Sequence, residues 1–291
     1  MSNTISPALR TLTAISIIVL MLATSGSSEK LTHNGRGKRD LVFLDAKTLV
    51  FVEQVGPRQL AIMKLNIDSG VSKPLHPDMR NNEFEPCFAP DGKHYAFLQN
   101  IGNLNLRLVI RNADTKAEFD FRQGGFSGMR SPCFTADSKQ VIYAYPENGR
   151  QHLWKCDLQC RERVKLIDSS GSNNWPCATP DGKTIVFGST RDGNFELYRA
   201  SIDGSDVRRL TDNPRQDIRP TVSSDGARIA FTSNRDSNYE LYVMDLFGRS
   251  LERITSNPER DDFPAWHPDG RLAWVAEESG RFDIHLQTVD D

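Results

Sequence analysis

The chain has 291 residues, of which 38% are hydrophobic, 25% are charged and 9% are aromatic. This balance is typical of a water-soluble globular protein and excludes a disordered or collagen-like chain. The formal net charge is −2, from 36 Lys and Arg against 38 Asp and Glu. Because this leaves no cationic excess to neutralise a row of phosphates, we expect no nucleic-acid binding.

The first 28 residues differ from the rest of the chain. Arg10 is the only charged residue among them, and residues 12–23 form a mostly apolar run that is too short to span a bilayer. Small residues at 23–27 then supply a cleavage site of the A-x-A type. We therefore predict a signal peptide over 1–28 and a periplasmic or secreted protein. The alternative is an uncleaved signal that anchors the chain in the membrane.

The remaining sequence repeats with a period of 44 to 46 residues. The clearest unit is Pro176-Cys-Ala-Thr-Pro-Asp-Gly-Lys183, and its aspartate recurs at one point of every copy. The recurring aspartates are Asp91, Asp137, Asp181, Asp225 and Asp269, preceded by Asp45 in a copy that lacks the upstream proline. A period in the low to mid forties is typical of the blades of a β-propeller. We therefore predict an all-β, six-bladed propeller.

The fourth repeat shows the four strands expected in each blade, at 176–179, 184–189, 195–202 and 207–211. Asp-Gly pairs follow the first and third strands, and glycine accepts the positive φ that a tight hairpin needs. The second strand, Thr184-Ile-Val-Phe187, is apolar on both faces. Each four-stranded antiparallel sheet must therefore be packed between two neighbours.

The two ends of the chain complement each other. The last repeat stops at Asp291 after its third strand, while Lys30-Leu-Thr-His-Asn34 resembles the fourth-strand segments Arg209-Leu-Thr-Asp-Asn213 and Arg253-Ile-Thr-Ser-Asn257. We predict that Lys30–Asn34 completes the sixth blade and closes the ring without a covalent link. Closure removes the exposed sheet edges that invite aggregation. The propeller domain is expected to span 29–291.

Several of these motifs together resemble a known family. The segments Pro-x-x-Ser/Thr/His-x-Asp-Gly, the run Ser189-Thr-Arg-Asp-Gly-Asn-Phe-Glu-Leu-Tyr198 and the run Asp203-Gly-Ser-x-x-x-Arg-Leu-Thr211 are similar to the TolB-like, WD-like propeller repeat. The resemblance covers the propeller alone, and the N-terminal α/β domain of TolB is expected to be absent. It implies an envelope scaffold that binds a protein, as TolB binds the peptidoglycan-associated lipoprotein. Related propellers gate prolyl-oligopeptidase-type enzymes, but the sequence has no Gly-x-Ser-x-Gly elbow.

The residues before each repeat's proline vary from blade to blade, so they are not needed to build a blade. By chain path they lead from an outer strand to the next inner strand, and we predict loops around one mouth of the central channel. Mixed aromatic and charged residues favour binding hot spots. The candidate partner-binding residues are Glu85, Arg130, Trp175, Asp217, Arg219, Asp261 and Phe263. The alternative is solvated loop tips, with Trp175 packed between blades.

Residues that recur in the repeat are interpreted as structural. Arg191-Asp192 and Arg235-Asp236 occupy one position of two successive copies. Asp217 and Asp261 are also expected to order the chain before the proline by capping backbone NH groups, with calcium binding as the alternative. The six histidines fall at non-equivalent positions, and none is identified as catalytic.

Five cysteines are present, an odd number that excludes complete pairing within one chain. Cys87, Cys133 and Cys177 occupy the same place on the innermost strand of three blades. We interpret them as small buried apolar residues, and three thiols that hold a soft metal are the alternative. The spacing of Cys156 and Cys160 permits a local disulfide across a turn.

The sequence therefore predicts an exported, monomeric propeller that binds a protein or peptide partner of the cell envelope and has no catalytic activity. No cofactor or metal is expected. The rival hypothesis is a carbohydrate- or peptide-processing lyase or hydrolase. Its acid and base would be carboxylates at the channel mouth, drawn from Glu83, Glu85, Asp217 and Asp261.

Overall fold

The computed structural model describes residues 28–102, 105–122 and 128–289. Residues 1–27, which hold nearly all of the predicted signal peptide, lie outside the described residues. Among the residues that are described, no helix has the length and apolar character needed to cross a membrane.

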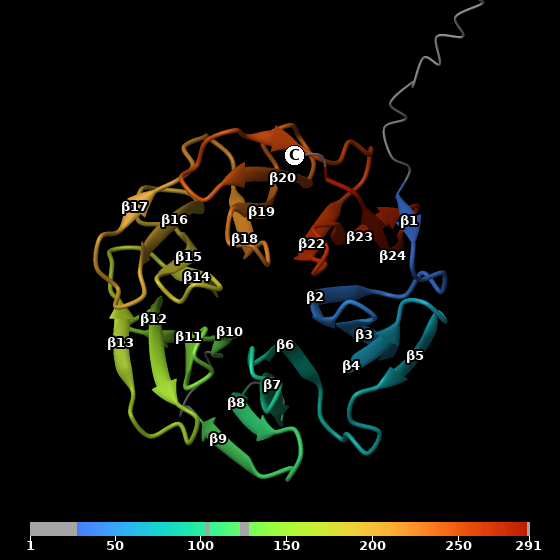
Figure 1. Cartoon of the computed structure of the whole chain (residues 1–291), viewed down its shortest axis with the longest axis horizontal. Helices are drawn as coiled ribbons and strands as arrows, with labels where there is room; N and C mark the ends of the chain where they lie inside the picture. Colours follow the sequence, from blue (N-terminus) through green and yellow to red (C-terminus); the bar gives the residue numbers. More distant parts are fainter. Residues whose placement is uncertain (1–27, 103–104, 123–127, 290–291) are drawn as a thin grey trace, which may run out of the picture.

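The described residues form six four-stranded antiparallel sheets, arranged as blades around a central channel (Figure 1). Blade 1 contains β2 (Lys38–Asp45), β3 (Thr48–Gly56), β4 (Gln59–Asn66) and β5 (Val71–Pro74). Blade 2 contains β6 (Glu83–Phe88), β7 (His94–Ile101), β8 (Asn105–Asn112) and β9 (Glu118–Arg122). Blade 3 contains β10 (Arg130–Phe134), β11 (Gln140–Glu147), β12 (Arg150–Asp157) and β13 (Val164–Ile167).

Blades 4 and 5 repeat the same strand order, from the channel outward. Blade 4 contains β14 (Asn173–Ala178), β15 (Thr184–Ser189), β16 (Glu196–Ser201) and β17 (Arg208–Arg209). Blade 5 contains β18 (Asp217–Val222), β19 (Arg228–Ser233), β20 (Glu240–Asp245) and β21 (Glu252–Arg253). Blade 6 takes strands from both ends of the chain, namely β22 (Asp261–Trp266), β23 (Leu272–Glu278), β24 (Arg281–Gln287) and β1 (Glu29–Lys30).

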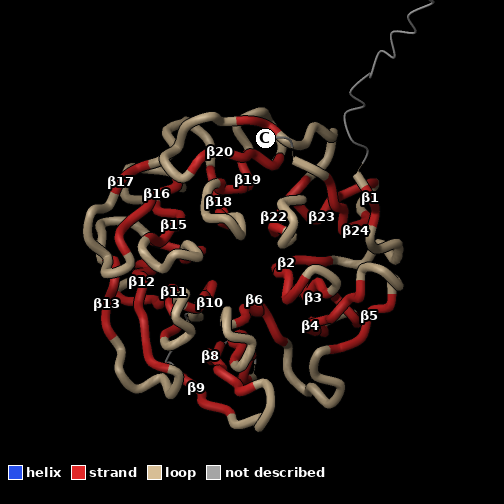
Figure 2. Tube along the Cα trace, in the orientation of Figure 1, coloured by secondary structure: helices blue, strands red, loops and turns tan. Residues whose placement is uncertain are grey.

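The core of the protein lies between adjacent blades, which follow one another around the ring in Figure 2. Ile185 and Phe187 on β15 are fully buried against Ile142 on β11 of the preceding blade. Val186, on the other face of β15, packs instead with Phe231 of the next blade. Burial of each such side chain contributes about 1.5–3 kcal/mol. The prediction of sheets packed on both faces is confirmed.

The ring is closed by the N-terminal strand, as predicted. β1 pairs antiparallel with β24, with Glu29 opposite Leu286 and Lys30 opposite His285. The amide of Leu31 then donates to the carbonyl of Ile284 at 2.7 Å. The regular strand covers Glu29–Lys30, shorter than the predicted Lys30–Asn34, because the following residues turn toward blade 1.

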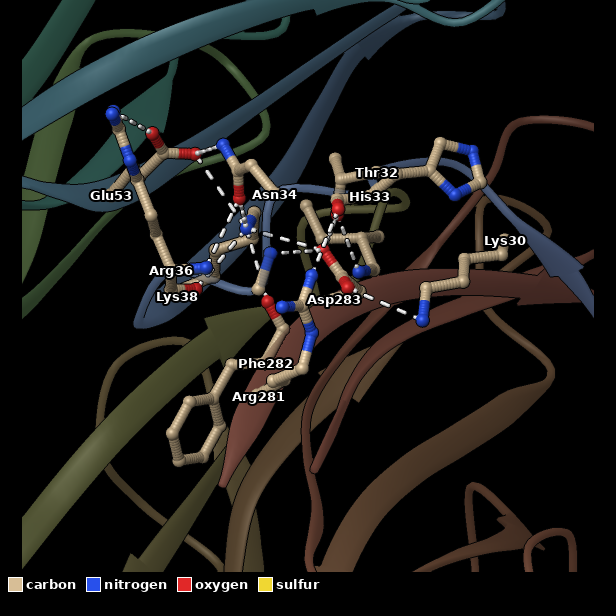
Figure 3. Close-up of polar contacts among 12 residues, drawn as sticks. Lys30, Thr32, His33, Asn34, Arg36, Lys38, Glu53, Arg281, Phe282 and Asp283 are labelled. Atoms are coloured by element: carbon tan, nitrogen blue, oxygen red, sulfur yellow. Dashed lines mark hydrogen bonds and ion pairs between the residues drawn. The ribbon is translucent and has the colours of Figure 1, made fainter. Parts of the chain in front are cut away.

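A buried cluster, which we call the closing latch, holds this junction (Figure 3). The Asp283 carboxylate accepts hydrogen bonds from the Thr32 hydroxyl at 3.0 Å and the Gly35 amide at 3.1 Å. The Lys38 ammonium, whose side chain is 0% exposed, lies 3.5 Å from Asp283 and 3.6 Å from Glu53. Burial lowers the pKa of Lys38, although the two carboxylates oppose that effect. The latch therefore connects the first blade to the last.

The pre-proline segments differ from the predicted loops, because they already belong to the innermost strands. In blade 2, for example, β6 begins at Glu83, three residues before Pro86. Phe84 pairs with Leu98 and Cys87 with Ala96, so three steps along β6 oppose two along β7. This is a β-bulge. A proline has no NH to donate to the ladder, and a bulge is one of the few places where a sheet accepts it.

Candidate functional site

All six innermost strands carry the same bulge, and it gives one residue in each blade a left-handed backbone. That residue has a φ between 47° and 57° in every blade. The six are Asp40, Glu85, Ser131, Trp175, Arg219 and Phe263, which we call the mouth ring. None is a glycine, although a left-handed backbone costs other residues about 1–2 kcal/mol each. Such recurrent strain points to a use for the side chains.

The mouth ring surrounds one end of the central channel. The innermost strands β2, β6, β10, β14, β18 and β22 face the central opening in Figure 1. Side chains from these strands line a cavity of about 420 Å³, and its lining includes all six residues of the mouth ring. Arg39 and Arg130, each beside a ring residue, line it as well. A cavity of this volume falls within the range of small-ligand and peptide side-chain sites.

One side of the mouth ring is acidic and hydrogen-bonded. The Asp40 carboxylate accepts from the Glu85 amide at 3.2 Å, and the Glu85 carboxylate accepts from the Ser131 amide. Arg39 lies 3.8 Å and Arg130 lies 3.9 Å from Glu85. Burial raises the pKa of Glu85, and the neighbouring Asp40 carboxylate raises it further, while the Ser131 amide and the two arginines oppose this.

The opposite side is aromatic and cationic. The Arg219 guanidinium lies 4.5 Å from the ring centre of Phe263 and 5.4 Å from that of Trp175. It also forms an ion pair with Asp262 at 3.2 Å. Arg39 lies over the outer side of Phe263, at 5.7 Å. These cations and rings contact one another in the wall of the cavity.

Five of the seven predicted partner-binding residues line this cavity. They are Glu85, Arg130, Trp175, Arg219 and Phe263. Trp175 is half-buried and packs against Phe195 with ring centroids 5.0 Å apart, so it lies in the cavity wall and also contacts its own blade.

Asp217 and Asp261 are a correction to the prediction, because both are buried away from the channel. Asp217 is 0% exposed and receives two bonds from the Arg235 guanidinium, at 2.8 and 3.0 Å. Asp261 is 1% exposed and accepts from the Asn257 amide at 2.7 Å. Side-chain amide and guanidinium groups hold them, in place of the expected backbone NH groups. We therefore remove both aspartates from the candidate set.

Sequence reasoning missed Asp40, Ser131 and Arg39. The first blade lacks the proline that marked the other sites, so Asp40 was not aligned with them. Its register shift between Arg39 and Val42 matches the shift in the other blades. Each ring residue lies five or six residues before the recurring aspartate of its repeat, and this spacing identifies the whole mouth ring in the sequence.

Of the five cysteines, Cys177 lines the mouth cavity. Burial raises the pKa of the thiols of Cys87, Cys133 and Cys177, so these groups stay protonated. Cys156 and Cys160 are free thiols, and the disulfide considered for them is not formed in the structure. They meet through a hydrogen bond, which raises the pKa of Cys156. Within the described ranges, no group of three or more potential ligands is arranged to hold a metal ion.

Fold and site together define a six-bladed β-propeller with one backbone scheme in all blades and a different inward-facing side chain in each. A family model for the TolB beta propeller domain (PD40) matches residues 84–239. The chain therefore belongs to the TolB beta-propeller domain family. No curated protein sequence matches the chain.

Solved structures with this fold include TolB proteins and an enzyme. TolB from Acinetobacter baumannii is 23% identical with a TM-score of 0.66, over 78% of this chain and 59% of that chain. The chain thus spans 59% of the length of that TolB. A putative TolB from Agrobacterium tumefaciens is 17% identical with a TM-score of 0.70, over 89% and 93%. An oligogalacturonate lyase in complex with manganese is 15% identical with a TM-score of 0.63, over 90% and 79%. At these identities the likeness shows the fold alone.

Proposed function

We propose that this protein is a non-catalytic scaffold that binds a protein or peptide partner of the cell envelope through the mouth ring. The observation that carries the proposal is the left-handed backbone of six non-glycine residues. Glycine at these positions avoids the steric cost, so the retained side chains imply a function outside the blade itself. Membership of the TolB beta-propeller domain family supports the same class of function.

The chemistry of the mouth ring suggests which part of a partner it contacts. The rings of Trp175 and Phe263 flank the Arg219 guanidinium, which presents a flat, partly desolvated cation. Aromatic and arginine side chains near the centre of an interface contribute most of its binding energy. A partner that inserts an acidic or aromatic side chain into the cavity would use both features.

The test compares two variants that remove the same pair of residue types. Arg219→Ala/Phe263→Ala removes the pair from the mouth ring. Arg249→Ala/Phe247→Ala removes an equivalent stacked pair, 5.1 Å apart, from the outer part of blade 5, where Phe247 is 55% exposed. Each purified protein is used for affinity capture from an envelope extract, followed by mass spectrometry. We expect the wild type and the outer variant to retain a partner that the ring variant loses.

The same experiment can also contradict the proposal. If all three proteins retain the same partners, the mouth ring is not the binding surface. Circular dichroism and cooperative thermal unfolding of both variants show that any loss of capture is not a loss of fold.

We also propose that the protein is exported, with residues 1–28 as the signal peptide. The sequence pattern described above and the family support this location. N-terminal sequencing of the protein recovered from its native cells is expected to begin between residues 25 and 29. An intact Met1 on soluble protein would contradict it.

A second candidate function is a lyase or hydrolase acting at the channel mouth. The observation in its favour is the Asp40 and Glu85 pair, in which burial and the neighbouring carboxylate raise the pKa of Glu85. A carboxyl group with a raised pKa beside a second carboxyl group is a usual arrangement of the acid and base in glycan-processing sites. Turnover of oligosaccharides or peptides that is abolished by both Asp40→Asn and Glu85→Gln would establish the enzyme and overturn the scaffold.

A further inference from the structure

A second cavity, of about 670 Å³, lies outside the channel between blades 1 and 2. Lys64 of β4 and the connection at residues 75–81 form its blade 1 wall. Strands β6, β7 and β8 form its blade 2 wall, with Tyr95 and Arg111 among the lining residues. These two blades are neighbours at the right and lower part of the ring in Figure 1. The cavity shares no lining residue with the mouth ring.

Blade 1 lacks a contact that blades 4, 5 and 6 share. In blades 4 and 5, a threonine after the outer strand donates to a buried glutamate of the same blade. Thr211 donates to Glu196 and Thr255 donates to Glu240, both at 2.6 Å. In blade 6, Thr32 and Asp283 make the same contact. We call these hydrogen bonds of blades 4, 5 and 6 the latch contacts.

His76 occupies the threonine position of blade 1. The Leu75 amide donates to the Ile62 carbonyl at 2.8 Å, as the Leu210 amide donates to the Leu197 carbonyl in blade 4. The residue before Ile62 is Ala61, so the buried carboxylate of the other blades is also replaced. Blade 1 has therefore lost both partners of the latch contact.

The imidazole of His76 instead reaches across to blade 2. Its Nδ1 lies 2.7 Å from a carboxylate oxygen of Glu83, and its Nε2 lies 2.9 Å from the Tyr95 hydroxyl. The other Glu83 oxygen accepts from the Gln99 amide at 3.3 Å, and the Tyr95 hydroxyl accepts from Arg111 at 3.4 Å. All five residues line the cavity. In blade 1, His76 therefore makes no latch contact. It belongs instead to a group of hydrogen-bonded polar side chains that line the cavity.

The lining is strongly cationic. It contains five cationic side chains, Lys64, Arg80, Arg107, Arg111 and Lys116, and two carboxylates, Asp78 and Glu83. Arg107 and Arg111 are also held by Glu118 behind them. Lys64 and Arg80 are exposed, and the described part of the chain gives neither side chain a hydrogen bond or an ion pair. Because the whole chain has a net charge of −2, this local excess is not a general property of the surface.

We propose that the cavity between blades 1 and 2 binds a small anionic molecule that carries a phosphate or carboxylate group. Lys64 and Arg80 bind the anionic group, since neither cation has a hydrogen bond or ion pair with the described residues. Tyr95 and Phe88, whose rings stack at 5.7 Å, together with Leu44 and Leu75, provide a wall for the uncharged part of the ligand. A concave site of several hundred Å³ with an apolar wall and a few convergent polar groups is the usual form of a small-molecule site.

The test uses isothermal titration calorimetry at constant ionic strength with four probes. The probes are inorganic phosphate, glucose 6-phosphate, glucuronate and glucose. We expect glucose 6-phosphate or glucuronate to bind, and glucose, which has no charge, to give no heat of binding. The stronger of the two anionic sugars identifies whether the site prefers phosphate or carboxylate.

Two matched variants locate the binding. Lys64→Ala/Arg80→Ala removes two exposed cations from the cavity and is expected to weaken the bound probe at least tenfold. Arg58→Ala/Lys73→Ala removes two exposed cations from blade 1 outside the cavity, and should leave the affinity within twofold. If no anion binds at millimolar concentration, if glucose binds as well, or if both variants lose affinity equally, the proposal is wrong. None of these residues belongs to the mouth ring, so the result is independent of the proposed function.

Discussion

The latch contacts and the mouth ring differ in what is repeated from blade to blade. At the latch contacts, Thr211 with Glu196 and Thr255 with Glu240 repeat both the side chains and the distances between them. At the mouth ring, the blades repeat a φ near 50° and a register shift but change the side chain each time. The first region requires particular side chains to fix the blade, whereas the second requires only the backbone.

This difference shows which positions of a repeat can vary and so acquire a function. A buried carboxylate has to be satisfied by defined donors, so every change at a latch contact costs stability. The bulge before each proline is fixed by backbone geometry, so Trp175 and Arg219 can occupy equivalent places with little effect on the blade. The following predictions test this division, from the largest expected effect to the smallest.

Asp283→Ala should give the largest effect, because it removes the centre of the closing latch. The change leaves the fully buried Lys38 ammonium with Glu53 as its remaining carboxylate neighbour. It also removes the acceptor of the Thr32 hydroxyl. Loss of one partner of a buried pair costs about 3–5 kcal/mol. Urea unfolding should show this loss. Asp212→Ala, at a carboxylate that is 82% exposed, should change the free energy of unfolding by less than about 0.5 kcal/mol.

Asp217 and Asp261 occupy equivalent positions in blades 5 and 6 but have different partners, so the two residues can be compared directly. Asp217 is paired with Arg235, whereas Glu278 stands at the corresponding place in blade 6. Burial, with some contribution from Glu240, raises the pKa of Asp261 to about 7. The folded state then binds more protons than the unfolded state between about pH 4 and 7. Stability from this group is present below pH 4 and is lost as the pH rises through 7.

Asp261→Asn removes that pH dependence. Relative to the wild type, we expect the variant to gain on the order of 4 kcal/mol of stability between pH 4 and pH 8, measured by urea unfolding across this range. Asp217→Asn should destabilise the protein across this range, since it breaks the ion pair in which Nη2 of Arg235 donates to both Asp217 oxygens. Equal losses for Asp261→Asn at pH 5 and pH 8 would contradict the raised pKa.

Ser131→Gly should give the smallest effect, and in the opposite direction. Ser131 has a φ of 51°, and its buried hydroxyl has no hydrogen-bond partner among the described residues. Relief of the left-handed strain should exceed the entropic cost of glycine and stabilise the protein by up to about 1 kcal/mol. Ser224→Gly, outside the set of left-handed residues, should be neutral or slightly destabilising in the same unfolding assay. A stabilised control would show that the gain is not specific to the mouth ring.

The fold was predictable because it depends on features with a period. The anchor aspartates fix the number of blades, and the apolar second strand Thr184–Ser189 matches β15 at both ends. The resemblance of Lys30–Asn34 to the fourth strands predicted the closure correctly. The channel mouth was predictable in part, since variable residues at a fixed place indicate a surface that is not needed for folding.

The remaining site residues depend on information that a pattern of apolar residues does not contain. A bulge reverses the alternation of inward and outward side chains, so Asp217 turns into the blade while Arg219 lines the channel. The cavity between blades 1 and 2 was missed because His76 was interpreted as a histidine at a non-equivalent position. Alignment of His76 with Thr211, and of Ala61 with Glu196, would have shown that blade 1 lacks the latch contact of blades 4, 5 and 6.

Closure by β1 also determines how the molecule comes apart. A linear stack of repeats has two end units, and each end unit has one neighbour and opens first. Here the pairing of β1 with β24 gives blade 6 a complete edge and gives every blade two neighbours. Amide hydrogen exchange from the six innermost strands should therefore follow one shared opening event. In Asp283→Ala the ring becomes a chain of blades with free ends, and exchange should begin in blades 6 and 1 and spread inward.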